Sequence, residues 1–180
     1  GSSVRYGANK LLEETKGMPM YQHMLKALSA FPALYRIVVS RYPEILEDAE
    51  RLGMQAVVNQ QPALGISHSL ILGLREAMAE NPDLKGVLFA VCDQPELKAD
   101  TISRLLRKAQ ENPGKIVCAG RNGRPGNPVV WDQRYFKELL GLAGDTGGRQ
   151  VMKNYPGDIL VLETAEEELR DIDRKEDMTE

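Results

Sequence analysis

Short apolar runs alternate with helix-like segments of about ten residues along most of this 180-residue chain. Such alternation predicts βαβ units, with a mainly parallel sheet and helices on both of its faces. The expected strands cover residues 34–40, 54–59, 86–92, 115–119, 128–131 and 159–163. The expected helices cover residues 18–30, 43–52, 67–80, 100–111, 133–140 and 146–154. A chain of this length can bury a proper core, so we expect one domain over residues 1–180.

Polar residues follow several of the expected strands. In parallel α/β sheets, ligands bind beyond the carboxyl ends of the strands. Asn59, Asp93 and the glycine-rich loop over residues 120–127 all lie there, so we expect them to share one rim. The run 86–92 is the most apolar in the chain and is expected to be the central strand. Asp100 or Thr101 is expected to cap the helix that follows.

Asp93 has two interpretations. It ends the most apolar strand and is followed by Gln94 and Pro95. A carboxylate at that point can hold Mg²⁺, which prefers one or two carboxylates together with phosphate oxygens and water. It can equally cap the next turn. Asp173, near the other end of the chain, is either a second metal ligand or the N-cap of a charged terminal helix.

The opening stretch combines small and cationic residues. Gly1, Ser2 and Ser3 are followed by Arg5 and Lys10. Small residues expose backbone N–H donors to a bound group, while an arginine fork and a lysine attract phosphate. The pattern suits a triphosphate, unless the first three residues are a cloning remnant and the cations are solvated. A loop of this kind normally follows a strand, so we expect that a first strand is missing before residue 1.

Two further segments carry candidate binding residues. The segment 65–70 opens a helix, where serine hydroxyls and free N–H groups can bind a base edge or an anion. The alternative is that Ser67 only caps that helix. The segment 144–149 is a tight turn into another helix. Its Arg149 either binds an anionic substrate or lies on a solvated face.

Composition narrows the partners. The net charge is −3 and there is no large basic block, so we do not expect nucleic acid as a partner. No apolar run has the length of a membrane span, and we expect neither a leader nor a membrane partner. Cys92 and Cys118 lie within apolar runs and indicate reduced core thiols of a cytoplasmic protein.

Together these segments resemble the MobA-like nucleotidyltransferase family, and most closely its molybdenum cofactor cytidylyltransferase branch. Six short motifs match in the family's order across essentially the whole chain. The matching residues are Gly1, Ser2, Ser3, Arg5, Gly7, Asn9 and Lys10, the segment 65–70, Asp93-Gln94-Pro95, Gly126-Asn127-Pro128, the segment 144–149, and Asp171-Ile172-Asp173. Asn127 stands where the family has a histidine, which puts the identity of the acceptor in question.

The resemblance implies a fold, a reaction and a set of roles. The fold is a Rossmann-like three-layer α/β/α, GT-A-like domain. The reaction is Mg²⁺-dependent transfer of CMP from CTP to the phosphate of molybdopterin, with release of pyrophosphate and delivery of the product to a molybdenum enzyme. The implied roles are catalysis for Arg5 and Lys10, nucleotide binding for Gly1, Ser2, Ser3, Asn59, Gly65, Ser67 and Ser69, acceptor binding for Gly126, Asn127, Asp145 and Arg149, and metal binding for Asp93 and Asp173.

Other functions remain open at this point. One is a guanylyl- or other nucleotidyltransferase acting on a sugar phosphate or another small phosphate acceptor. Another is a non-catalytic accessory protein that carries a nucleotide-linked cofactor to a molybdenum hydroxylase. The intact cation loop and both carboxylates favour an enzyme over such a carrier. A dehydrogenase is disfavoured, because no Gly-x-Gly-x-x-Gly follows a strand with an acidic residue about twenty positions on.

Overall fold

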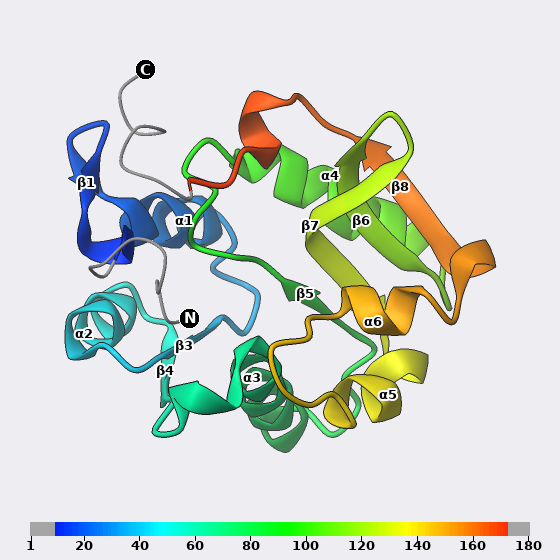
Figure 1. Ribbon diagram of the computed structural model, residues 1–180, viewed down its shortest axis with the longest axis horizontal. Helices are drawn as coiled ribbons and strands as arrows, with labels where there is room; N and C mark the ends of the chain where they lie inside the picture. Colours follow the sequence, from blue (N-terminus) through cyan, green and yellow to red (C-terminus); the bar gives the residue numbers. More distant parts are fainter. Residues whose placement is uncertain (1–9, 173–180) are drawn as a thin grey trace.

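A four-stranded sheet with the order β5-β7-β6-β8 forms the larger half of the computed structural model, which describes residues 10–172 (Figure 1). Its strands are β5 (Gly86–Phe89), β6 (Ile116–Arg121), β7 (Arg124–Asp132) and β8 (Ile159–Glu163). Strands β6 and β8 pair in parallel, whereas β7 is antiparallel to both β5 and β6. Strands β5, β6 and β8 therefore run in one direction, and the sheet is mainly parallel with β7 reversed.

The reversal of β7 comes from a tight hairpin. The sequence pattern predicted a loop over residues 120–127, but β6 and β7 remain paired up to the turn at Asn122-Gly123. Both turn residues have positive φ values, 50° and 71°, which is the geometry that a two-residue hairpin turn requires. Asn and Gly adopt it at low cost. The predicted loop is therefore wrong, because an Asn-Gly turn needs only two residues.

A second, smaller sheet lies beside the first. It consists of the parallel pair β3 (Ile37–Ser40) and β4 (Gln55–Val58), which are joined through α2 (Pro43–Arg51). No ladder among residues 10–172 connects this pair to the four-stranded sheet. Helix α3 (Ile66–Glu80) contacts both β3 and β5 and so holds the two sheets together.

The side chains of the sheet alternate between two helical layers. Ile116 and Cys118 pack with Leu74 of α3, whereas Val117 and Ala119 between them pack with Leu105 of α4. The remaining helical elements are α1 (Met20–Ser29), α4 (Ala99–Glu111), α5 (Phe136–Leu140) and α6 (Arg149–Met152). Residues of α5 and α6 lie on the α3 side, and α1 joins clusters on the α4 side. This arrangement confirms the predicted three-layer α/β/α fold.

The strand expected to be most buried is not. The residues of β5 are half-buried, while residues 116–120 of β6 are fully buried. The outer edge of β5 has no ladder partner in the part of the chain that the structure describes, so its side chains keep solvent contact. Strand β5 ends at Phe89, and residues 90–93 that follow it are not part of a ladder. Apolar composition therefore identified the strand but not its depth.

The cap of α4 also differs from the prediction. The helix begins at Ala99, and neither Asp100 nor Thr101 caps it. Instead Glu168, in the short segment η5 (Glu167–Leu169), accepts bonds from the Lys98 amide at 3.1 Å and the Thr101 hydroxyl at 2.6 Å. A carboxylate at a helix N-terminus also interacts favourably with the helix dipole. Glu168, which lies 67 positions from Thr101 in the sequence, thus replaces the local cap that was expected.

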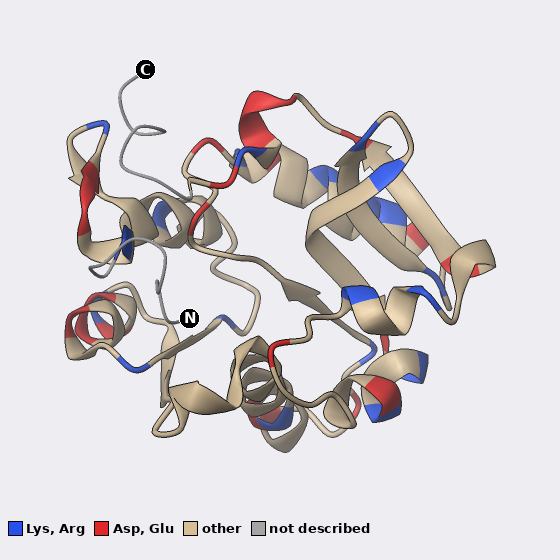
Figure 2. Cartoon of the chain, viewed as in Figure 1, with Lys and Arg blue, Asp and Glu red and all other residues tan. Residues whose placement is uncertain are grey.

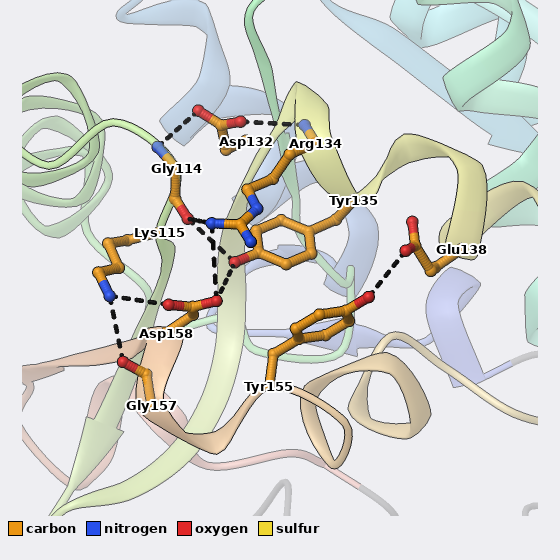
Figure 3. Close-up of polar contacts among 9 residues, drawn as sticks. All are labelled: Gly114, Lys115, Asp132, Arg134, Tyr135, Glu138, Tyr155, Gly157 and Asp158. Carbon is orange, nitrogen blue, oxygen red and sulfur yellow. Dashed lines mark hydrogen bonds and ion pairs between the residues drawn. The ribbon is translucent and has the colours of Figure 1, made fainter.

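A polar cluster supports the sheet where β6 and β8 begin (Figure 3). The Asp158 carboxylate lies 2.8 Å from Lys115 Nζ and 2.9 Å from the Tyr135 hydroxyl. These two hydrogen bonds lower the pKa of Asp158. Burial, together with the bond to Asp158, raises the pKa of Tyr135 to about 12, so its hydroxyl stays a donor at neutral pH. The cluster joins the residue before β6, the residue before β8 and the segment after β7.

The stability of the protein should depend on this carboxylate at acid pH. Because the pKa of Asp158 is lower in the folded than in the unfolded chain, where it is about 3.9, its contribution is present above that value and lost as pH falls through the folded pKa. We therefore expect Asp158→Asn to lower the free energy of unfolding at pH 7, and the gap from wild type to close as pH falls below about 4. Urea unfolding followed by the single tryptophan, the buried Trp131, measures both.

The exposed Asp83 supplies the control for this series. Asp83→Asn should follow the wild-type curve at each pH. A gap for Asp158→Asn that stays constant from pH 7 to pH 3 would show that the ionised carboxylate does not support the fold.

Candidate active site

Three segments that are far apart in the sequence meet after β5. Asp93 Oδ2 accepts a hydrogen bond from Lys10 Nζ at 2.8 Å. The same Nζ donates to the carbonyl oxygen of Ile172 at 3.1 Å, and the Ile172 amide donates to the carbonyl oxygen of Asp93 at 2.9 Å. Figure 1 shows the last described residues lying against the segment after β5. Lys10 and Asp93, to which the resemblance gives roles in one reaction, therefore lie in direct contact.

The Lys10–Asp93 pair is half-buried and incompletely satisfied. The two side chains are 15% and 24% exposed, so water screens their attraction less than on an open surface. Asp93 Oδ1 is buried and has no hydrogen-bond partner among residues 10–172. An unpaired buried carboxylate oxygen is costly, and a bound divalent cation would satisfy it. Asp93 therefore fits the role of a Mg²⁺ ligand.

A complete metal site is not present within the described residues. No group of three or more histidine, cysteine, aspartate or glutamate side chains in residues 10–172 is arranged to hold a metal ion. Asp173, the second predicted ligand, lies outside these residues. So do Gly1, Ser2, Ser3 and Arg5, and the roles given to all five stay predictions.

The residue after Asp93 fixes the neighbouring chain. Gln94 is 3% exposed, and its Nε2 donates to Asp171 Oδ1 at 2.9 Å and to the Leu169 carbonyl at 3.2 Å. Gln94 belongs to the Asp93-Gln94-Pro95 motif, but no role was predicted for it. Its partners lie 75 and 77 positions away, so no local pattern points to them.

The start of α3 contacts the turn at Gly144-Asp145. Ser67 is buried, and its hydroxyl donates to the Gly144 carbonyl at 2.6 Å. The Ile66 amide donates to Asp145 Oδ1 at 3.3 Å. Gly65 has a φ of 84°, and a Cβ there would lie 2.4 Å from Gly144 O, so this close approach requires glycine. Ser67 is thus not the helix cap; it joins two candidate binding segments.

Asn59 and Ser69 are bonded to each other. The Asn59 amide donates to Ser69 Oγ at 2.9 Å, and its Oδ1 accepts from the Gln61 amide at 2.9 Å. Asn59 is 4% exposed. These bonds tie the end of β4 to the start of α3. The structure therefore brings both predicted nucleotide-binding residues together.

Two segments that carry predicted acceptor residues contact each other at Arg149 and Pro125. Arg149 donates to the Pro125 carbonyl at 3.4 Å, next to Gly126 and Asn127. A Cβ at Gly126 would lie 4.0 Å from Leu169, whose carbonyl Gln94 binds. The other hydrogen bonds of the site form two groups. One joins Lys10, Asp93 and Gln94 to residues 169–172, and the other joins residues 59–69 to the turn at residues 144–145.

Acidic and basic side chains lie close together where η5 meets the β6–β7 hairpin. The acidic η5 segment lies beside the basic β6–β7 hairpin (Figure 2). Arg121 and Glu166 form an exposed ion pair at 3.4 Å. An open pocket next to them is lined by Arg121, Asn122, Glu166, Leu169 and Arg170. The pocket therefore includes Leu169, the residue whose carbonyl oxygen binds Gln94.

The cysteines have no place in the chemistry. Cys92 and Cys118 are both free thiols, and Cys118 is buried. Burial raises the pKa of Cys92 to about 12 and that of Cys118 to about 11. Both are protonated at neutral pH and are poor nucleophiles. Among the described residues, no helix is long and apolar enough to span a bilayer.

Comparison with solved structures identifies the fold. A nucleotidyl transferase from Methanothermobacter thermautotroptrophicus superposes with a TM-score of 0.76 at 23% sequence identity, over 93% of this chain and 81% of that one. The chain therefore has the Rossmann-like nucleotidyltransferase fold.

Comparison of sequences gives the family. Residues 1–159 match the family model of the MobA-like NTP transferase domain, and the chain belongs to that family. It is 28% identical to the purine catabolism protein PucB of Bacillus subtilis, over 98% of this chain and 89% of PucB. It is also 28% identical to a probable molybdenum cofactor guanylyltransferase of Bacillus licheniformis, over 78% of this chain and 68% of that protein.

Proposed function

We propose that this chain is a Mg²⁺-dependent nucleotidyltransferase that moves CMP from CTP to the phosphate of molybdopterin and releases pyrophosphate. The observation that carries this proposal is the meeting of Lys10, Asp93 and Ile172 at the carboxyl end of β5. A cation for phosphate and a carboxylate with an unpaired oxygen for a metal lie within hydrogen-bonding distance of each other. The family membership supports the same class of reaction.

The reaction asks mainly for positioning and charge neutralisation. A phosphate oxygen of the acceptor attacks the α-phosphorus of the triphosphate in line, and the bond from that phosphorus to the α–β bridging oxygen breaks as pyrophosphate leaves. Lys10, with Arg5, stabilises the charge that builds on the α-phosphate and on pyrophosphate. No side-chain base is required, because a phosphate acceptor is already anionic at neutral pH.

Asp93 and Asp173 are the residues that would hold the metal. When bound there, Mg²⁺ would supply neutralisation of the charge on the phosphates. Asp93 offers it one unpaired oxygen and has its other oxygen bound to Lys10. Asp93 would thus hold the metal close to the ammonium group of Lys10, and both would act on one triphosphate.

The choice of substrates rests on likeness rather than on geometry. The acceptor is proposed from the family resemblance and from the Bacillus licheniformis relative, a probable molybdenum cofactor guanylyltransferase. CTP is proposed in preference to GTP because the segment 65–70 resembles the cytidylyl branch of the family. Asn127, where that branch has histidine, is the residue at which the acceptor site departs from the pattern.

A substrate panel tests the proposal. Pyrophosphate release is measured with CTP, GTP, ATP and UTP, each with molybdopterin, with a sugar phosphate and without an acceptor, in Mg²⁺ or EDTA. We expect release only with CTP, molybdopterin and Mg²⁺ together. Preference for GTP or for the sugar phosphate would overturn the choice of substrate. Tight binding of the nucleotide-linked cofactor with no release from any pair would overturn the enzyme and favour a carrier.

A further inference from the structure

We infer that Gln94 is a positioning residue, whose amide holds residues 169–172 against Asp93 and so prepares the divalent-cation site. This inference rests on the proposed function. It adds a residue that would act on the metal site by fixing the chain beside Asp93. Gln94 itself is not assigned as a ligand.

The orientation of the Gln94 amide follows from its partners. Its Nε2 faces the Leu169 carbonyl and Asp171 Oδ1, and both of these are hydrogen-bond acceptors. Only the NH₂ group of the amide can bind them, so Oε1 must face the other way. Oε1 is buried without a partner among residues 10–172. The side chain therefore satisfies its donors and leaves its acceptor unpaired.

That imbalance argues against a packing role. Leaving a buried acceptor unpaired is costly, whereas an apolar side chain of similar size would avoid this cost. Methionine or leucine would fill the space at Gln94 better if filling it were the only requirement. The two donated hydrogen bonds must therefore be what the position requires.

The neutrality of the amide suits a site that must bind a cation. Asp93 and Asp171 are both carboxylates, so their repulsion opposes the approach of the segment that contains Asp171. Lys10 already pairs with Asp93, so a lysine or arginine at position 94 would add a second cation and neutralise Asp171 as well. A glutamine binds Asp171 and leaves that charge in place.

The backbone extends the hold of Gln94 to the neighbouring residue. The Ile172 amide binds the Asp93 carbonyl at 2.9 Å, and the Ile172 side chain is 6% exposed. Consecutive residues 93 and 94 thus bind residues 169, 171 and 172. Removing a residue that holds the surroundings of a metal ligand in place commonly changes metal affinity by about 10- to 100-fold.

Direct metal binding tests the inference without any enzymatic reaction. Mn²⁺ is titrated into the whole chain without nucleotide, and free Mn²⁺ is measured by electron paramagnetic resonance. We expect Gln94→Met to weaken Mn²⁺ binding by about 10-fold, and Gln94→Glu, which adds a charge facing Asp171, to weaken it at least as much. Urea unfolding of each variant, followed by Trp131 fluorescence, separates metal affinity from stability.

Glu168 provides the matched control, because it holds the same segment to α4 instead of to Asp93. Glu168→Gln should lower the free energy of unfolding, because its bonds to the Lys98 amide and the Thr101 hydroxyl are weakened. Its Mn²⁺ affinity should stay within twofold of wild type. Equal loss of Mn²⁺ affinity in Glu168→Gln and Gln94→Met would mean that any loosening of the segment has this effect, and would overturn the specific role of Gln94.

The inference and the proposed function fail in different ways. If wild type binds Mn²⁺ and releases pyrophosphate while Gln94→Met binds Mn²⁺ equally well, the role of Gln94 is wrong and the proposed function stands. If wild type neither binds Mn²⁺ nor releases pyrophosphate, the proposed function is wrong and the role of Gln94 falls with it.

Discussion

Asp93→Asn is expected to lower kcat for nucleotidyl transfer about 10³-fold while the chain stays folded. The neutral amide keeps the size of the side chain but loses the charge that would hold the metal. The buried Oδ1, which has no partner among the described residues, is then no longer a free carboxylate oxygen for a cation. The measurement is the rate of pyrophosphate release at saturating CTP, molybdopterin and Mg²⁺. Thermal unfolding checks that the variant is folded.

Asp100→Asn is the matched control for this substitution. Asp100 is exposed in the first turn of α4 and has no part in the proposed site. It should keep the wild-type rate within twofold. A kcat for Asp93→Asn within about threefold of wild type would remove Asp93 from the metal site and leave it as a structural partner of Lys10.

Lys10→Met is expected to lower kcat about 10²-fold, with a smaller rise in KM for CTP. Methionine keeps most of the unbranched stem but loses the ammonium group, which binds Asp93 and the Ile172 carbonyl. If Lys10 stabilises charge that develops during transfer, the loss falls on kcat more than on ground-state binding. Initial rates over a range of CTP concentrations separate the two parameters.

Lys16 supplies the control lysine, because it is exposed and forms an ion pair with Glu96. Lys16→Met should change kcat by less than twofold. The double variant Asp93→Asn/Lys10→Met should lose much less than the product of the two single losses, because the residues act as a unit. Fully multiplicative losses would mean that Lys10 and Asp93 act independently, against the site proposed for them.

The layers of this fold could be predicted because they depend on local periodicity. Alternating apolar runs and helical segments gave the three layers and the parallel direction of β5, β6 and β8. The same rule placed Asp93 at a strand end, where the structure brings it to within 2.8 Å of Lys10, 83 residues away. A strand over residues 128–131 was predicted, but the earlier start of β7 and its reversed direction were missed because residues 120–127 were interpreted as one loop. The hairpin signal was nevertheless present in the Asn122-Gly123 dipeptide.

Contacts between distant segments could not be predicted from spacing. Glu168 caps α4, Gln94 binds Asp171, and Ser67 binds Gly144, each across at least 67 residues. None of these partners shares a local motif with the residue it binds. They are consequences of which elements the folded chain places side by side, and periodicity carries no information about that. The roles of Arg5 and Asp173 stay predictions for a different reason, since both lie outside the described residues.

Helix α3 touches both β3 and β5, although no ladder connects the two sheets within residues 10–172. Unravelling α3 would remove packing from both sheets, so its amide protons should be among the slowest in the protein to exchange with solvent deuterium. The short β1–β2 hairpin (Glu14–Thr15 and Met18–Pro19) does not pack between the two sheets, and its amide protons should exchange much faster. Since Gly65 to Ser69 lead into α3, the proposed nucleotide-binding groups would then be mounted on the slowest-exchanging unit of the protein.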